Sequence, residues 1–126
     1  MRTAKLTLVA FLVLTFSLGW SVAQARSIYF DQGKVQFEKH NYKQARQYFE
    51  QVVRESPYDA GARYYLGLAC QAMGDHRSAR VEFDWVARNA DVPQLKGYAM
   101  QALQALDEAA ADGKKQEKRN AKKNKG

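Results

Sequence analysis

The sequence repeats itself at an interval of 34 residues. A shift of the chain by that interval pairs residues of the same type, namely Gly33 with Gly67, Ala45 with Ala79, Arg46 with Arg80, Phe49 with Phe83, Val52 with Val86 and Arg54 with Arg88. A period of this length, held across two helices' worth of chain, is typical of architectures that stack one supersecondary unit on the next. The chain is therefore predicted to stack two copies of a small unit.

Each unit is predicted to be a helix, a turn and a second helix. The four helices are expected at about Ser27–Lys39, Tyr42–Glu55, Ala60–Met73 and Arg77–Ala90. Asn41 and Asp75 are of the residue types that cap a helix N-terminus, so both are expected to cap the second helix of their unit. Gly74 can take the left-handed conformation that ends a helix. Pro57 disfavours continuation of the helix before it.

Gly33 and Gly67 fall in the middle of the first helix of each unit. A glycine there costs about 1 kcal/mol relative to alanine. Its recurrence at the same phase indicates a close approach between helices, with the phased alanine of the second helix as the opposing thin spot. Phe49 and Phe83 are expected to fill the space between the two helices of their unit.

With these residues in these phases, the chain resembles the tetratricopeptide repeat over about Ser27–Pro93. The first unit matches the family pattern at Gly33, Tyr42, Ala45, Phe49 and Pro57, and the second at Leu66, Gly67, Gly74, Asp75, Ala79, Phe83 and Ala87. Departures are His40, where a turn glycine is usual, and Tyr29 and Arg63, where the family has a large aromatic residue.

A further amphipathic helix is expected at about Gln94–Ala111. Its apolar residues recur at helical spacing on one face, namely Leu95, Tyr98, Ala99, Ala102, Leu103, Leu106 and Ala110. The predicted fold is therefore all-α, a short right-handed solenoid of two repeats closed by a capping helix. Its parts are a leader over 1–25, repeats over 26–59 and 60–93, the capping helix over 94–112 and a tail over 113–126.

The first 25 residues have the layout of a secretory signal. Basic Arg2 and Lys5 precede an apolar run over Leu6–Trp20, and Ala23-Gln24-Ala25 offers the small-residue pattern at which such signals are cleaved. We expect export to the periplasm or secretion, with a mature chain that begins at Arg26. The alternative is that the segment stays as an uncleaved anchor.

The positive charge of the chain lies at its two ends. Of the formal +7, the tail over 113–126 contributes +6, whereas residues 26–112 sum to −1. Residues 113–126 are predicted to form a disordered tail, because so few apolar residues cannot drive folding. The tail is either a solvated end or, through Lys114–Lys125, a contact for anionic membranes, cell-wall polymers or an acidic partner. Nucleic acid is not expected, because no aromatic residue is interleaved for base stacking.

No catalytic set is recognisable. His40 and His76 fall in or beside the turns, and further ligands would be needed for a metal site. Cys70 lies among apolar residues, where a packing role is usual. We therefore predict no enzymatic activity, no metal and no cofactor. An enzyme would need a site assembled across subunits.

The resemblance implies a groove on the concave face formed by the first helix of each unit. By phase, its residues are Phe30, Lys34, Phe37, Tyr64, Leu68, Gln71 and Tyr98. Aromatic rings with a lysine and a glutamine suit an extended or helical peptide with apolar anchors. The alternative is that several of these rings pack between helices. Phe30 and Tyr65 also exclude the carboxylate clamp that some members use for chaperone C-termini.

The sequence thus predicts an exported interaction module, an adaptor or assembly factor, that binds a peptide or protein of unknown identity. The alternative is a protein tethered to anionic envelope components by its lysine-rich tail. Because arrays of this kind usually need about three repeats for stability, self-association or docking onto a larger assembly is also expected.

Overall fold

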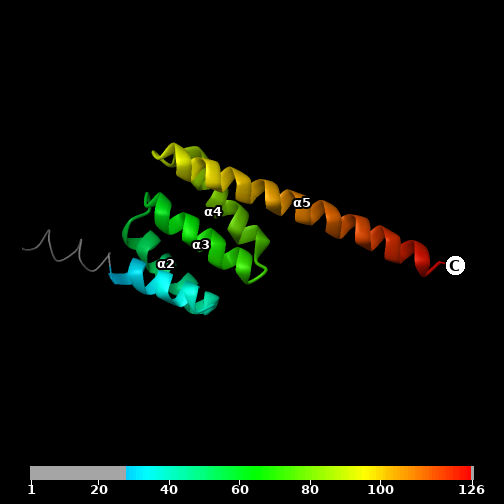
Figure 1. Ribbon diagram of the computed structural model, residues 1–126, viewed down its shortest axis with the longest axis horizontal. Coiled ribbons are helices and arrows are strands. Elements are labelled where there is room, and N and C mark those ends of the chain that lie inside the picture. The colour runs from blue at the N-terminus through cyan, green and yellow to red at the C-terminus, as the bar shows by residue number, and fades with distance from the viewer. Residues whose placement is uncertain (1–27, 126) are drawn as a thin grey trace, which may run out of the picture.

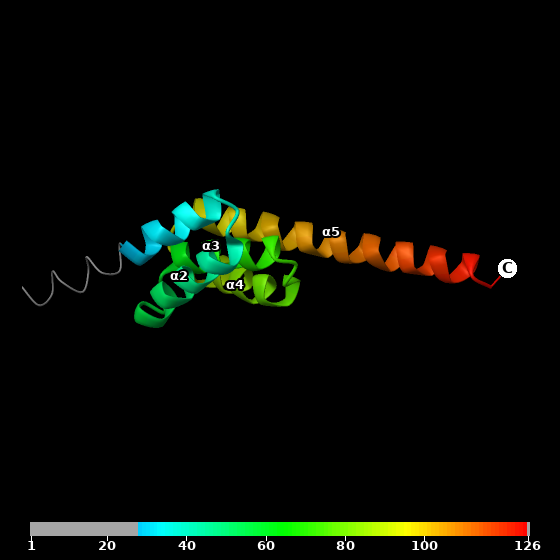
Figure 2. The same cartoon turned by 90° about the horizontal axis from the view of Figure 1, so that it is seen from below.

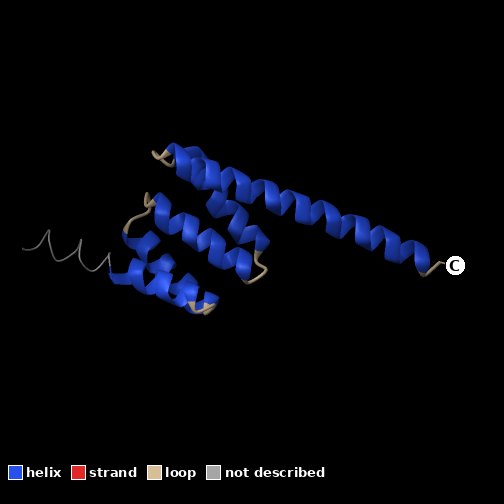
Figure 3. Cartoon of the chain, in the orientation of Figure 1, coloured by secondary structure: helices blue, strands red, loops and turns tan. Residues whose placement is uncertain are grey.

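The computed structural model describes residues 28–125, and over that range the chain is helical with no strand (Figure 3). A helix over residues 28–38 is followed by α2 (Tyr42–Glu55), α3 (Ala60–Ala72), α4 (His76–Asn89) and α5 (Pro93–Lys123) (Figure 1). The all-α prediction is confirmed, and the predicted bounds of α2 to α4 differ from these by one residue at most. The predicted signal and its cleavage near Ala25 lie outside the described residues.

The helices stack in chain order. α3 packs between α2 and α4, α4 packs against α5, and α3 also touches α5. The last part of α5 runs well past the other helices in both ribbon views (Figures 1 and 2). None of the helices within residues 28–125 combines the length and the apolar character that a membrane span requires.

The core of each unit is one phenylalanine ring set against one glycine. Phe49 and Phe83 are both fully buried. A Cβ atom on Gly33 would lie 2.7 Å from Cε1 of Phe49, and one on Gly67 would lie 2.6 Å from Cε1 of Phe83. Both distances are shorter than real Cβ contacts allow. The expected close approach at these glycines therefore exists, and the opposing group is the ring itself.

The turn between the two helices of each unit is stabilised by different hydrogen bonds in the two units. In the second unit, Gly74 has a φ of 78° and the carboxylate of Asp75 accepts a hydrogen bond from the backbone N–H of Ser78 at 3.1 Å, as expected. In the first unit, the expected cap is wrong, because Asn41 makes no capping hydrogen bond and its amide donates to Oε1 of Gln36 at 2.9 Å.

His40 occupies the turn position equivalent to Gly74 and has a φ of 59°. A residue with a Cβ atom costs about 1 kcal/mol in this left-handed region. We expect His40→Gly to raise the free energy of unfolding by about 0.5–1 kcal/mol, since the exposed hydrogen bond between Nδ1 of His40 and the hydroxyl of Tyr42 adds little. The reciprocal change, Gly74→His, is expected to lower it by about as much. Urea denaturation followed by circular dichroism measures both, and effects of the same sign would contradict this account.

The Asp75 cap makes stability depend on pH. Hydrogen bonds from Ser78, and then the guanidinium of Arg46, lower the pKa of the Asp75 carboxyl from its ordinary value of 3.8. A carboxyl whose pKa is lower in the folded chain stabilises the fold above its unfolded pKa, and loses that effect as the pH falls through the folded value. We expect the melting temperature of the wild type to fall more steeply below about pH 4 than that of Asp75→Asn. If the melting temperatures of the two proteins fell equally with pH, titration of the Asp75 cap would not contribute to stability, contrary to this prediction.

The tail differs from its prediction. α5 continues to Lys123, well beyond the expected end at Ala111, so the structure shows no disordered tail over residues 113–123. Residues 113–125 are all exposed in the described part of the chain, but lysine, arginine, glutamine and alanine are good helix formers. An existing helix also adds residues without the cost of a new nucleus. Asp112 pairs with Lys115 at 3.7 Å, and Lys122 and Lys123 lie favourably at the negative end of the helix dipole.

Candidate functional site

Five aromatic side chains form a connected series across three helices. We call this series the aromatic row; its members are Phe30, Phe37, Tyr64, Tyr65 and Tyr98. The ring of Tyr65 meets Phe30 edge-on at a centroid distance of 5.6 Å and Phe37 at 6.2 Å. Tyr64 joins Tyr65 at 6.2 Å and Tyr98 at 6.4 Å. These separations are those of ordinary aromatic contacts, so the row is continuous.

The row follows the repeat of the sequence. Phe30, Tyr64 and Tyr98 are 34 residues apart and come from the helix over residues 28–38, from α3 and from α5. Each of the three helices is the first helix of a unit, because α5 packs on the second unit as the first helix of a third unit would. One position of the repeat thus places a ring on every second helix, three times along the chain.

The seven predicted groove residues are all half-buried or exposed. Phe30, Phe37, Tyr64 and Leu68 pack with one side against the core, Lys34 and Gln71 are half-buried, and Tyr98 is 45% exposed. The rings of Phe30, Phe37 and Tyr64 therefore pack between helices and still remain partly exposed to solvent, whereas their role in a groove stays a prediction. Residues 30, 34 and 37, like residues 64, 68 and 71, lie on one face of their helix by spacing.

Sequence reasoning missed the role of Tyr65 in the row. Its ring stacks on Phe49 at 5.3 Å and touches both Phe30 and Phe37, so it joins the first unit to the second. It is one residue away from the phased position, which is why the repeat did not mark it. The signal in the sequence that could have identified Tyr65 is its position next to Tyr64, which is at the phased position.

The phenol of Tyr64 is a neutral hydrogen-bonding group. Burial raises the pKa of Tyr64 above its ordinary value of 10, and the neighbouring Tyr65 and Tyr98 raise it further. Tyr64 therefore keeps its proton at neutral pH and can donate it to a carbonyl oxygen. The hydroxyl of Tyr98 accepts a hydrogen bond from Gln94 at 3.0 Å. The row thus combines apolar rings with polar tips, a combination enriched at protein interfaces.

Comparison with known protein families identifies the fold. A family model described as tetratricopeptide repeat matches residues 36–98, which is half of the chain. The matched range contains Phe49, Gly67 and Phe83 and begins shortly after Gly33. The chain belongs to the tetratricopeptide-repeat family. No curated protein and no solved structure matches it. Tetratricopeptide repeats generally mediate protein–protein interaction and are generally not enzymes.

One of the two phased arginine pairs, Arg46 and Arg80, ties consecutive tetratricopeptide units together. Arg46 of α2 donates to Asp75, in the turn of the second unit, at 3.2 Å. Arg80, its equivalent in α4, donates to Asp107 of α5 at 2.6 Å. Each bond runs from the second helix of one unit to the next unit. The repeated arginine is therefore explained by stacking, although these half-exposed pairs contribute little energy singly.

Arg63, Glu82 and Cys70, which are charged or reactive residues of the two repeats, make contacts that hold the helices together. Arg63 pairs with Glu82 at 2.9 Å and lies 4.4 Å from the centre of the Trp85 ring, which holds α3 against α4. Cys70 is buried, and that burial raises the pKa of its thiol, which disfavours the reactive thiolate. Residues 28–125 contain no cluster of three or more His, Cys, Asp or Glu side chains that could hold a metal.

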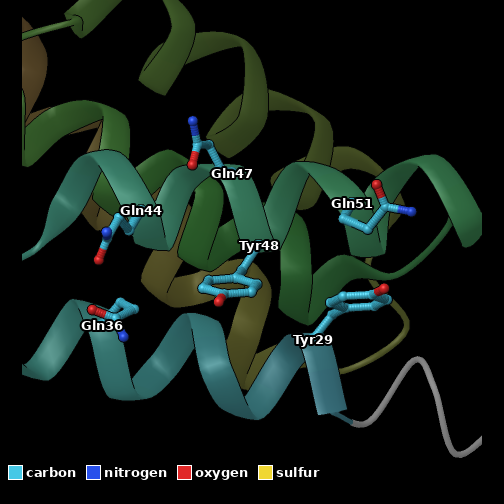
Figure 4. A pocket seen from close by; sticks show the side chains of 6 residues that line it. All are labelled: Tyr29, Gln36, Gln44, Gln47, Tyr48 and Gln51. Carbon is cyan, nitrogen blue, oxygen red and sulfur yellow. The ribbon is translucent and has the colours of Figure 1, made fainter.

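A polar hollow marks the outer side of the first repeat. It has a volume of about 520 Å³, and its lining comes only from the helix over residues 28–38 and from α2 (Figure 4). Two tyrosines and four glutamines line it, namely Tyr29, Tyr48, Gln36, Gln44, Gln47 and Gln51. A polar outer face is what the terminal unit of a repeat array needs to stay soluble. We therefore assign the hollow to capping of the array.

Proposed function

We propose that this protein is an exported interaction module that holds a peptide segment of a partner protein across the aromatic row. The observation that supports this most directly is the recurrence of a half-buried or exposed ring at one repeat position on three alternate helices, namely the helix over residues 28–38, α3 and α5. Family membership supports protein binding in general, and the row suggests where the partner lies.

The chemistry of the row defines the segment that fits it. Aromatic side chains are enriched among the residues that dominate binding energy at interfaces, so the partner is expected to present apolar anchors. Lys34 is half-buried beside Phe30 and Phe37 on its helix and forms no ion pair with any residue of the described chain. An acidic residue between the anchors would complement it. The expected partner segment is therefore apolar with an acidic residue near Phe30 and Phe37.

Tyr98 is the position at which to test this proposal, because it is part of the row and yet 45% exposed. Tyr58, which is 87% exposed in the loop between α2 and α3, is the matched control. A photo-crosslinking amino acid at each position, in cells that make the protein, should yield a discrete adduct from position 98 and not from position 58. Equal adducts, or adducts from position 58 alone, would oppose the proposal.

The same pair of tyrosines tests the energetics. Once the partner from the position-98 adduct is identified, Tyr98→Ala is expected to weaken its binding by about tenfold to thirtyfold, the effect of removing an aromatic interface anchor. Tyr58→Ala should change the dissociation constant by less than about twofold. Fluorescence anisotropy with the labelled partner segment measures both constants.

Export is a separate part of the proposal and rests on the first 25 residues. Mass spectrometry of the protein recovered from cells should find a chain that begins at Arg26. An intact Met1 would instead support the anchor. Size-exclusion chromatography with light scattering would show whether the small folded part associates with itself.

A further inference from the structure

The basic residues of the end of α5 lie on one side of the helix. We call residues 113–123 the distal arm; its basic residues are Lys114, Lys115, Lys118, Arg119, Lys122 and Lys123. At about 100° per residue, these six fall within one half of the helix circumference, which we call the basic face. The opposite half holds the other side chains of the arm, namely Gln116, Glu117, Asn120 and Ala121. A disordered tail would have no such face.

The basic face is turned away from the side by which α5 packs on the repeats. Ala99 and Leu106 are buried against the solenoid, and Glu117 follows Leu106 by 11 residues, close to three full turns. Glu117 therefore continues the packing side, and the basic face lies opposite to it. The arm also extends beyond the other helices (Figures 1 and 2), so its surface is open along its length.

The charges of the arm are almost unpartnered within the described chain. Within residues 28–125, Lys115 alone among the six has an acidic partner, Asp112 at 3.7 Å, and both side chains of this pair are more than 70% exposed. Lysines four apart on a helix repel each other. Because residues 26–112 carry a net charge of −1, the folded part offers no neutralising surface. A large anionic surface outside the chain would relieve this repulsion.

Three features of the arm favour a bilayer surface over other polyanions. Five of its six basic residues are lysines, compact hydrated charges that suit many separate phosphates, whereas paired recognition of carboxylates or nucleic acid favours arginine. The basic face covers half of the helix, which suits a plane. The arm contains no aromatic ring to stack on bases, which disfavours nucleic acid. It also contains no large apolar residue that could enter the acyl region, so on a bilayer it would lie at the level of the headgroups.

We propose that the basic face docks the distal arm on the headgroups of an anionic phospholipid bilayer. The arm lies on the surface without insertion, held by charge alone. Its binding is therefore salt-sensitive and independent of the aromatic row, so that a partner peptide and a membrane can be held at once.

Vesicle binding of the full chain tests this with two variants. The rearranged variant exchanges Lys115 with Gln116, Arg119 with Asn120 and Lys123 with Asn124. It keeps the composition and net charge but spreads the basic residues over both sides. The neutralised variant is Lys118→Gln with Lys122→Gln, and its charge-matched control is Lys39→Gln with Lys43→Gln, two exposed lysines at the first turn. Circular dichroism should show equal helicity in all four chains.

Sedimentation with vesicles of phosphatidylcholine, with and without about 30% phosphatidylglycerol, gives the binding ratio due to charge, because any contribution of the apolar leader is common to both. We expect the wild type, with six basic residues on the arm, to prefer anionic vesicles by about ten-thousandfold at ~0.1 M salt and to lose this preference near 1 M. The rearranged variant should lose at least about tenfold and the neutralised variant about thirtyfold, whereas the control should change by less than about threefold.

Two results would overturn the proposal. If the rearranged variant bound anionic vesicles as tightly as the wild type does, net charge, and not the basic face, would determine the binding. Tighter binding of the wild type to poly-glutamate or to a DNA duplex, at equal concentrations of anionic groups, would assign the arm to an acidic protein or to nucleic acid instead.

Discussion

Phe83→Ala is expected to lower the free energy of unfolding by about 3–5 kcal/mol, because it removes a fully buried ring and leaves a cavity. Since small domains are stable by only about 5–15 kcal/mol in total, the variant should be largely unfolded near physiological temperature. Phe49→Ala, at the equivalent position of the first repeat, should behave similarly. Urea denaturation followed by circular dichroism at 222 nm, the usual wavelength for helix content, measures the change.

Val81→Ala is the matched control for this prediction. Val81 is in α4 with Phe83, but it is 60% exposed, so its loss should change the free energy of unfolding by less than about 0.5 kcal/mol. A Phe83→Ala variant as stable as Val81→Ala would mean that the ring is not the centre of the second repeat.

Gly67→Ala is expected to cost about 2–3 kcal/mol, although alanine is by itself the better helix former. The added Cβ would lie 2.6 Å from Cε1 of Phe83, a fully buried ring with no free space to enter. Gly97→Ala is the matched control, because a Cβ there meets nothing within 4 Å, and it should stabilise α5 by up to about 1 kcal/mol. The same denaturation experiment separates the two glycines by the sign of the effect.

The steric clash between a Cβ atom on residue 67 and the ring of Phe83 also predicts that substitutions at these two positions are energetically coupled. In a Phe83→Leu background, where the side chain is smaller, Gly67→Ala should cost at least about 1 kcal/mol less than in the wild type. Strict additivity of the two changes would contradict the contact between this glycine and this ring.

The fold could be predicted to this extent because its strongest constraint is periodic. The glycine and the phenylalanine of each unit recur together, so the pattern in the sequence reflects a contact that is made twice. The Asp75 cap was also predictable, since it depends only on residues within one turn of helix. The end of α5 was not, because the prediction weighed apolar burial and left out the ease of extending a helix that packing has already nucleated.

The candidate site could be predicted only in part. Phase identified Phe30, Tyr64 and Tyr98 as equivalent positions, but the fraction of each ring left exposed depends on how neighbouring helices pack. Tyr65 depends on that packing too, because its contacts lie on another unit. For the same reason, the repeat marks Arg46 and Arg80 but not the acidic residues that they reach.

Ring chemical shifts of the tyrosines test most directly whether the aromatic row holds a partner segment. A peptide selected from a random library against the full chain would be titrated into protein with carbon-13 in its tyrosine rings. The signals of Tyr64, Tyr65 and Tyr98 should move together with one dissociation constant, while that of Tyr58 stays in place. Movement of Tyr29 and Tyr48, which line the polar hollow, with the row unchanged would contradict this account.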